Sequence, residues 1–190
     1  MIIGLCGKAG SGKDTAAYRI WELNPSVRIS SFAASLKRKV KYDFNLTEDD
    51  VFTNEGKERE TRYKDSYGMI LTVRDLLQQV GSFYRNISPN YWVDRCFSEM
   101  YDDVDYVISD VRYPNEAMKI LETVGGVVIR IDISPAVQSM RVKNIDRNHA
   151  SETALDDFPR FSARLNGDLP MDAYLESVTA IYNKIRGLSI

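Results

Sequence analysis

Blocks of apolar residues along the chain predict short strands, each followed by a segment in which apolar residues recur at helical spacing. The strand-like runs are residues 1–6, 27–31, 106–109, 127–133 and 161–165. Strands that alternate with helices form parallel sheets, and right-handed crossovers place the helices on both faces. The pattern therefore predicts an α/β fold with a five-stranded parallel sheet, whose ligands gather at the carboxyl ends of the strands.

The helical segments are recognised by the apolar faces that they turn inward. These faces are formed by Ala16, Ala17, Ile20 and Trp21; by Val73, Leu76, Leu77 and Val80; by Trp92, Val93, Cys96, Phe97 and Met100; by Ala117, Ile120, Leu121 and Val124; and by Tyr174, Leu175, Val178, Ile181, Tyr182 and Ile185. Residues 32–44 are predicted to form a further helix, which carries a cluster of basic residues. Thr72 is predicted to be an N-cap, and prolines at the first helical position predict helices that begin at Ser88-Pro89 and at Ser134-Pro135.

Residues 45–68 differ from the rest of the chain because they are strongly polar and show no convincing apolar face. We interpret them as a mobile insertion. A chain of 190 residues is otherwise suited to one domain with a sizeable core, so a single domain over residues 1–190 is expected.

The segment after the first strand has the G-x-x-x-x-G-K spacing of a phosphate-binding loop. Glycines let backbone N–H groups curve around a polyphosphate, the next helix adds its positive end, and Lys13 supplies a charge to the β- and γ-phosphates. Asp14 stands where the usual pattern has a hydroxyl for Mg²⁺, and a hydroxyl follows at Thr15. The alternative is a glycine-rich turn. The predicted ATP-binding residues are Gly7, Lys8, Ala9, Gly10, Ser11, Gly12, Lys13, Asp14 and Thr15.

Composition and charge exclude several classes of protein. Hydrophobic residues make up 44% of the chain, charged residues 27%, and the net charge is −2. We therefore expect a cytoplasmic protein that binds neither a membrane nor a nucleic-acid polymer. Cys6 and Cys96 lack metal-ligand spacing and are expected to be buried small hydrophobes. His149 is the single histidine, which argues against a histidine metal cluster and a serine-triad hydrolase.

Phosphoryl transfer needs positive charge around the migrating group and a holder for Mg²⁺. Asp110, at the end of the strand 106–109, fits the carboxylate that positions Mg²⁺, although it could also cap the next turn. Arg112 is expected to face the same cleft and to grip an acceptor phosphate; the alternative is an ion pair with Glu116.

Further arginines are placed where they could meet an anion. Arg74 and Arg85 are eleven residues apart, so they lie on nearly the same face of one helix and frame a second anion, or they pair with acidic neighbours (Asp75 or Asp94). Arg141 and Arg147 flank a helix end, where a closing lid would bring them onto the transferring phosphate; surface solvation is the alternative. A basic cluster either meets an anion or is a solvated helix face: Lys37, Arg38, Lys39 and Lys41.

At these positions the chain resembles the deoxynucleoside monophosphate kinases of bacteriophages and some bacteria, which have the P-loop kinase fold. The family's S-G-K-D-T loop is matched by Ser11 to Thr15, including the aspartate in place of the usual hydroxyl. The other matching segments, which together span nearly the whole chain, are Val73 to Gln78 with Gly81 and Arg85, Trp92, Ser109 to Glu116, His149 to Glu152, and Asn166-Gly167.

The resemblance implies a three-layer α/β/α P-loop kinase fold with a helical acceptor-binding insertion at residues 45–101 and a lid at about residues 134–160. It implies transfer of the ATP γ-phosphoryl to a deoxynucleoside monophosphate, giving the diphosphate, with Asp14, Thr15 and Asp110 near Mg²⁺. The residues assigned to catalysis are Lys13, Asp110, Arg112, Arg141 and Arg147. The residues assigned to the acceptor are Lys37, Arg74, Gln78, Arg85, Trp92, Arg112 and Glu116, with Trp92 either at the base site or in the core.

Two other functions fit the same residues. One is a P-loop kinase of another small phosphorylated acceptor, of the phosphomevalonate kind, and the other is an ATP-binding regulatory protein that transfers no phosphate. The sequence leaves open the accepted base, ribose against deoxyribose, and monomer against homodimer; the compartment would be the host cytoplasm for a bacteriophage protein. It also gives no role to His149, Ser151 and Glu152, the last two of which could begin a short helix.

Overall fold

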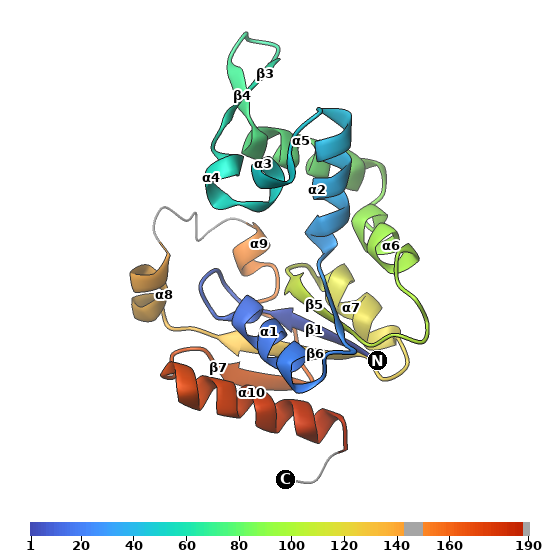
Figure 1. Ribbon diagram of the computed structural model, residues 1–190, viewed down its shortest axis with the longest axis vertical. Coiled ribbons are helices and arrows are strands. Elements are labelled where there is room, and N and C mark those ends of the chain that lie inside the picture. Colours follow the sequence, from blue (N-terminus) through green and yellow to red (C-terminus); the bar gives the residue numbers. More distant parts are fainter. Residues whose placement is uncertain (143–149, 188–190) are drawn as a thin grey trace. The chain divides into compact units, whose positions relative to one another are not determined.

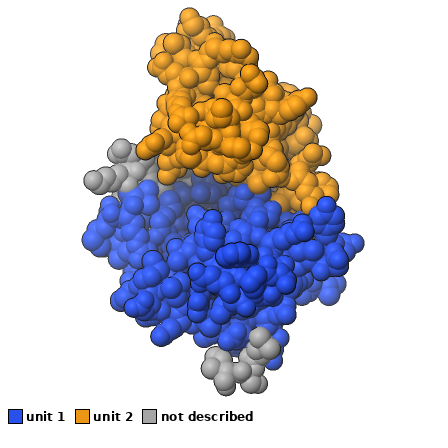
Figure 2. Space-filling view, in the orientation of Figure 1, with its two compact units in different colours: residues 1–31, 100–190 blue, residues 32–99 orange. Residues whose placement is uncertain are grey.

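Five parallel strands form the sheet of the larger of two compact units, which comprises residues 1–31 and 100–190 (Figure 2). This computed structural model describes residues 1–142 and 150–187. The central strand β1 (Ile2–Cys6) is flanked by β5 (Tyr106–Val111) and then β2 (Arg28–Ser30) on one side, and by β6 (Val127–Asp132) and then β7 (Ala163–Asn166) on the other (Figure 1). All four pairings are parallel, so the predicted fold class is confirmed.

Helices cover both faces of this sheet and give it three layers. On one face, α1 (Lys13–Leu23) and α10 (Met171–Ile185) share a core with Ile3 and Leu5 of β1. On the other face, α7 (Pro114–Glu122) approaches β1 closely at Gly4, where an added Cβ would lie 2.6 Å from Ile120 Cδ1. Because β1 is buried from both sides, its sequence is a continuous apolar run rather than an alternating one.

Two short helices follow β6 in the chain. Ser134 caps α8 (Pro135–Arg141) by accepting a hydrogen bond from the Val137 N–H, which confirms the predicted start. The helix α9 (Ala150–Thr153) is a single turn.

Two apolar residues that were expected to face inward are exposed. Trp21 is 45% exposed, because the buried face of α1 is completed by Ala16, Ala17 and Ile20 and the next residue is rotated about 100° away from it. Val124 is 96% exposed, because α7 ends at Glu122 and the chain has already turned away from the sheet.

The second unit, residues 32–99, has its own core. Its elements are α2 (Phe32–Asp43), α3 (Glu48–Phe52), α4 (Asn54–Lys57), the antiparallel pair β3 (Glu60–Lys64) and β4 (Ile70–Thr72), α5 (Val73–Ile87) and α6 (Tyr91–Ser98). Thr72 caps α5 in a reciprocal box with Asp75, as predicted. The helix α6 begins two residues later than predicted, after Asn90.

The expectation that residues 45–68 lack a core face is wrong. They contain α3, α4 and β3, and Val51 of α3 is completely buried in the core of the second unit. The two helices begin at Thr47 and Thr53, whose hydroxyls accept hydrogen bonds from backbone N–H groups. Helices of four and five residues are too short to show a period of 3.6, so their single apolar anchor was not recognised.

Two further observations bear on the class of protein. Cys6 and Cys96 are both buried, as expected, and burial raises the pKa of the Cys6 thiol to about 12. Within residues 1–142 and 150–187, none of the helices combines the length and the apolar character needed to cross a bilayer.

Candidate active site

The loop between β1 and α1 closes around the amine of Lys13. The Nζ atom donates hydrogen bonds to the carbonyl oxygens of Gly7 and Lys8 at 2.8 and 2.9 Å. Gly10 and Gly12 have φ angles of 76° and 100°, which side chains other than glycine rarely adopt. This is the geometry of a phosphate-binding loop, with backbone N–H groups and the N-terminus of an eleven-residue helix at its mouth.

The electrostatics of Lys13 follow from its burial and from nearby charges. Burial, and then repulsion from Arg112, lower its pKa to about 8, while Glu152 and Asp14 act in the opposite direction. The amine therefore keeps its proton at neutral pH, but the negative charge around it does not compensate for its burial and for the repulsion from Arg112. A polyphosphate would supply that charge.

A cavity of about 340 Å³ opens beside the loop. Its polar end is formed by the loop and the start of α1, including Lys13, Asp14 and Thr15, and its other end is largely apolar. The residues that complete it are Arg141, Gly167, Leu169, Met171 and Tyr174. Of these, only Arg141 was assigned to the site from the sequence; the signal that could have found the others is Asn166-Gly167, directly after the last strand, at the sheet edge where ligands gather.

Two polar contacts fix the loop from the side of the cavity. The Tyr174 hydroxyl donates to the Gly12 carbonyl oxygen at 2.9 Å, and Arg141 Nη1 donates to the Gly10 carbonyl oxygen at 3.0 Å. Arg141 therefore lies at the phosphate loop, and its catalytic role stays a prediction. Arg147 and His149 lie outside the described residues.

Ser11 is the loop residue whose side chain is least satisfied. Its Oγ is buried and has no hydrogen-bond partner among residues 1–142 and 150–187. Buried hydroxyls usually have partners, so this atom is an exception among the buried side chains that the structure describes.

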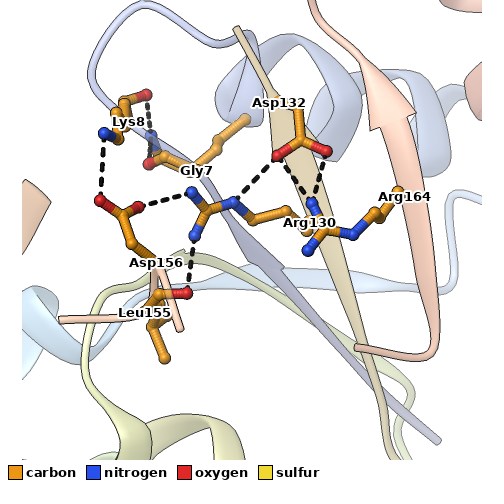
Figure 3. A network of polar contacts seen from close by, with 8 residues as sticks. Gly7, Lys8, Arg130, Asp132, Leu155, Asp156 and Arg164 are labelled. Carbon is orange, nitrogen blue, oxygen red and sulfur yellow. Dashed lines mark hydrogen bonds and ion pairs between the residues drawn. The ribbon is translucent and has the colours of Figure 1, made fainter. Parts of the chain in front are cut away.

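A chain of alternating charges supports the loop from below (Figure 3). Asp156 accepts from Lys8 Nζ at 3.1 Å and from Arg130 Nη2 at 2.8 Å, and Arg130 also reaches Asp132, which pairs with Arg164. Burial raises the pKa of Asp156, but the hydrogen bonds from Arg130 and Lys8 outweigh this and hold it below its ordinary value. The network joins the loop to β6 and β7, and it was not predicted.

Asp110 lies within a strand rather than after one, which corrects the predicted strand end. β5 continues to Val111, and Val111 pairs with Cys6, the last residue of β1. Asp110 is therefore beside the point where the phosphate loop begins. No group of three or more His, Cys, Asp or Glu residues suited to a metal occurs in the described parts of the chain.

Arg112 follows β5 and is held by two carboxylates. Its backbone N–H donates to Glu116 Oε2 at 2.7 Å, and its guanidinium pairs with Glu152 Oε1 through Nη1 at 3.0 Å. Glu116 is 5% exposed and also accepts the Tyr113 N–H, so its carboxylate serves the start of α7. The ion pair of Arg112 that was considered with Glu116 is formed with Glu152 instead.

The other residues assigned to the acceptor belong to the second unit. Arg74, Gln78 and Arg85 lie on α5, and Arg74 Nε donates to Glu58 Oε1 at 2.8 Å rather than to Asp75. Lys37 on α2 lies 4.8 Å from the ring centroid of Phe52.

Trp92 occupies a core position in the second unit. It is 3% exposed, and its Nε1–H donates to the Gly81 carbonyl oxygen at 3.1 Å. It also lines a separate cavity of this unit, together with Ser35, Arg38, Lys39, Tyr42, Asp43, Tyr91, Arg95 and Glu99. Two of the cations of that cavity, Arg38 and Arg95, pair with Glu99.

The three-layer fold carries a phosphate loop at the end of its central strand and basic residues beside that loop. Together these features define a P-loop kinase. No protein-family model matches the sequence. A protein of Acanthamoeba polyphaga mimivirus named "Putative deoxynucleotide monophosphate kinase" is 33% identical over 170 residues, which cover 82% of each chain. The chain belongs to the deoxynucleotide monophosphate kinase family.

Solved structures similar to this chain include two shikimate kinases. The enzyme from Aquifex aeolicus has 17% identity, a TM-score of 0.48 and coverage of 97% of both chains. The enzyme from Acinetobacter baumannii, in complex with shikimate, has 12% identity, a TM-score of 0.49 and coverage of 100% of this chain and 94% of its own.

Proposed function

We propose that this protein transfers the γ-phosphoryl group of ATP to a deoxynucleoside monophosphate and forms the diphosphate. The observation that carries the proposal is the presence of two cations at the same end of the sheet. Lys13 lies in the phosphate loop, and the guanidinium of Arg112 is close enough to lower the pKa of Lys13. Phosphoryl transfer needs positive charge on both the donor and the acceptor side of the migrating group.

The cavity beside the loop is suited to ATP. Backbone N–H groups and Lys13 would hold the phosphates, and the largely apolar end at Leu169 and Met171 would receive the base. Arg141 lines the same cavity and contacts the loop, so it is available to the transferring phosphate.

The residues near the loop also fit Mg²⁺. Asp14 and Thr15 line the cavity beside Lys13 and offer one carboxylate and one hydroxyl, and Asp110 lies on the neighbouring strand. Mg²⁺ usually takes only one or two protein carboxylates and completes its shell with water and substrate phosphates, so these three residues would suffice as its protein ligands. When bound, Mg²⁺ would neutralise charge that develops on the β- and γ-phosphates.

Two arguments support a nucleoside monophosphate as the acceptor: the family to which the chain belongs, and the arginines of this chain that could bind the acceptor phosphate. Arg112 presents a planar fork that matches a phosphate, and Arg74, Gln78 and Arg85 provide further donors along one helix. The deoxynucleoside part of the proposal rests on the mimivirus relative and on the matching loop with Asp14.

The proposal is tested by offering all common ribo- and deoxyribonucleoside monophosphates, with ATP and Mg²⁺, in a coupled assay of ADP release. ADP release that depends on a deoxynucleoside monophosphate, with the diphosphate identified by chromatography, is the expected result. Release with phosphomevalonate or another small phosphorylated acceptor alone would replace the proposed acceptor. ATP binding without any acceptor-dependent ADP would reject the enzymatic function.

A further inference from the structure

Glu152 connects the phosphate loop with the arginine assigned to the acceptor. Its Oε2 accepts the Ala9 N–H at 2.8 Å, and its Oε1 accepts Arg112 Nη1 at 3.0 Å. The residue is 8% exposed and lies on the single-turn helix α9. One buried carboxylate thus contacts two segments that are 143 and 40 residues away in the sequence.

The contact with Ala9 is one of two that hold this residue of the loop. Gln138 of α8 is 3% exposed, and its Nε2 donates to the Ala9 carbonyl oxygen at 3.2 Å. Ala9 is therefore fixed on its N–H side by Glu152 and on its carbonyl side by Gln138. Of these two residues, only Glu152 also contacts Arg112.

A carboxylate is required at this position because both of its partners are donors. Each of its two oxygens accepts one hydrogen bond, from Ala9 and from Arg112. A glutamine has one accepting oxygen and one NH₂ group, so it could satisfy only one of the two and would face the other donor with a donor. An aspartate keeps both oxygens but is one methylene shorter.

The negative charge also balances the cations at the site. Arg112 and Lys13 repel each other, and Glu152 is a source of opposite charge for both. Since an unpaired buried charge is costly, Glu152 and Arg112 stabilise each other in their places.

We propose that Glu152 is a positioning residue for phosphoryl transfer. It fixes the guanidinium of Arg112 relative to the phosphate loop. The acceptor phosphate bound by Arg112 is thereby kept at a constant position relative to the ATP phosphates bound by the loop. This inference rests on the proposed kinase function. It gives a role to Glu152, for which the sequence supplied none.

The test is a double-mutant cycle with wild type, Glu152→Gln, Arg112→Ala and the combined variant, in which kcat and both KM values are measured. In the wild-type background we expect Glu152→Gln to lower kcat by about 10- to 100-fold, the range expected when a reacting group is misplaced by a fraction of an ångström to about 1 Å. In the Arg112→Ala background the effect should shrink to less than about threefold, because glutamine can satisfy Ala9 once the second donor is gone.

A matched control distinguishes the positioning of Arg112 by Glu152 from mere support of the loop at Ala9. Gln138→Met removes the other hydrogen bond to Ala9 without touching Arg112. Its effect on kcat should multiply with that of Arg112→Ala instead of shrinking. Equal effects of Glu152→Gln in both backgrounds, or an unchanged kcat, would overturn the inference. If Glu152→Gln is shown by thermal melting not to fold, Glu152→Asp replaces it in the same cycle, with the same expected coupling and the same contrary result.

The failure of this inference can be told from failure of the proposed function. If the wild type phosphorylates no nucleoside monophosphate, the proposed function is rejected. The four proteins of the cycle are then compared by their ATP dissociation constants, measured by calorimetry. Glu152→Gln should weaken ATP binding at least threefold in the wild-type background and less in the Arg112→Ala background. The same factor in both backgrounds would overturn the role of Glu152.

Discussion

The hydroxyl of Tyr174 donates a hydrogen bond to the carbonyl oxygen of Gly12 across 2.9 Å. This contact joins the closing helix α10 to the last loop residue before α1. A side chain on Gly12 would crowd Tyr174, since an added Cβ would lie 3.0 Å from the same hydroxyl, and the φ of 100° also favours glycine. The position of the loop is therefore set partly by a residue 162 positions later in the chain.

The first prediction concerns Tyr174→Phe, which removes this hydroxyl and leaves the ring. We expect a loss of about 1 kcal/mol in the free energy of unfolding, the usual contribution of one hydrogen bond, and a several-fold weaker ATP affinity. Urea denaturation and calorimetry measure the two effects. The matched control is Tyr182→Phe on the same helix, whose hydroxyl accepts from Asn24 at 3.2 Å, away from the loop. That variant should lose stability only; equal ATP affinities of both variants would contradict the role of Tyr174.

Lys13→Ala and Arg112→Ala should each lower turnover by at least about 100-fold, because each removes a cation that stabilises the negative charge developing during phosphoryl transfer. Steady-state ADP release measures this, and far-ultraviolet circular dichroism checks the fold. Arg112→Lys should remain well below wild type, since an ammonium group keeps the charge but lacks the planar fork. Unchanged turnover in either alanine variant would contradict the assignment of that residue.

The stability of the second unit should depend on pH through Asp75. Hydrogen bonds from the Thr72 side chain and backbone hold the pKa of Asp75 below its ordinary value. A carboxyl whose pKa is lower in the folded state stabilises the fold above its unfolded pKa and loses this contribution as the pH falls through the folded pKa.

Asp75→Asn should therefore destabilise the protein at pH 7, by about 1 kcal/mol as for loss of a helix cap, and the difference from wild type should shrink as the pH falls below the ordinary carboxyl pKa of about 4. Urea denaturation of both proteins at pH 7 and pH 3 measures it. A difference of equal size at the two pH values would show that the charge of Asp75 contributes nothing.

Acceptor binding should protect residues 45–68 from proteolysis. The turn between β3 and β4 is strongly exposed, with Tyr67 at 91% and Met69 at 68%, and such a turn is a ready cleavage site. Limited proteolysis with and without a deoxynucleoside monophosphate measures the effect. Equal cleavage rates at saturating nucleotide would count against a role of this segment at the acceptor.

The sheet and the phosphate loop could be predicted because their signals are local. The strand β1 is a continuous apolar run, and the glycine and lysine spacing follows it directly. Residues 45–68 could not be predicted correctly, because α3 and α4 are each shorter than two turns and depend on the burial of Val51 and on threonine caps.

The supporting residues of the site were missed for a different reason. Asp156 and Glu152 act through partners far away in the sequence, and no local spacing of residues reveals such a pairing. Arg112 illustrates the difference: its position after a strand indicated a site, whereas the identity of its carboxylate partner required the fold. Local motifs therefore indicate candidate site residues, whereas the distant partners that hold these residues become visible only in the fold.

Gly4 lies in the central strand at a point where a side chain would meet α7. Ile120 of α7 fills the space that a methyl group on residue 4 would need, and the same helix begins directly after the Arg112–Tyr113 turn. Replacing this glycine by alanine would force the side chains of Ile120 and Val111 to move, because an added Cβ would lie 2.6 and 3.0 Å from them. Even one added carbon at the middle of the sheet would therefore disturb the packing between β1 and the helix that follows Arg112.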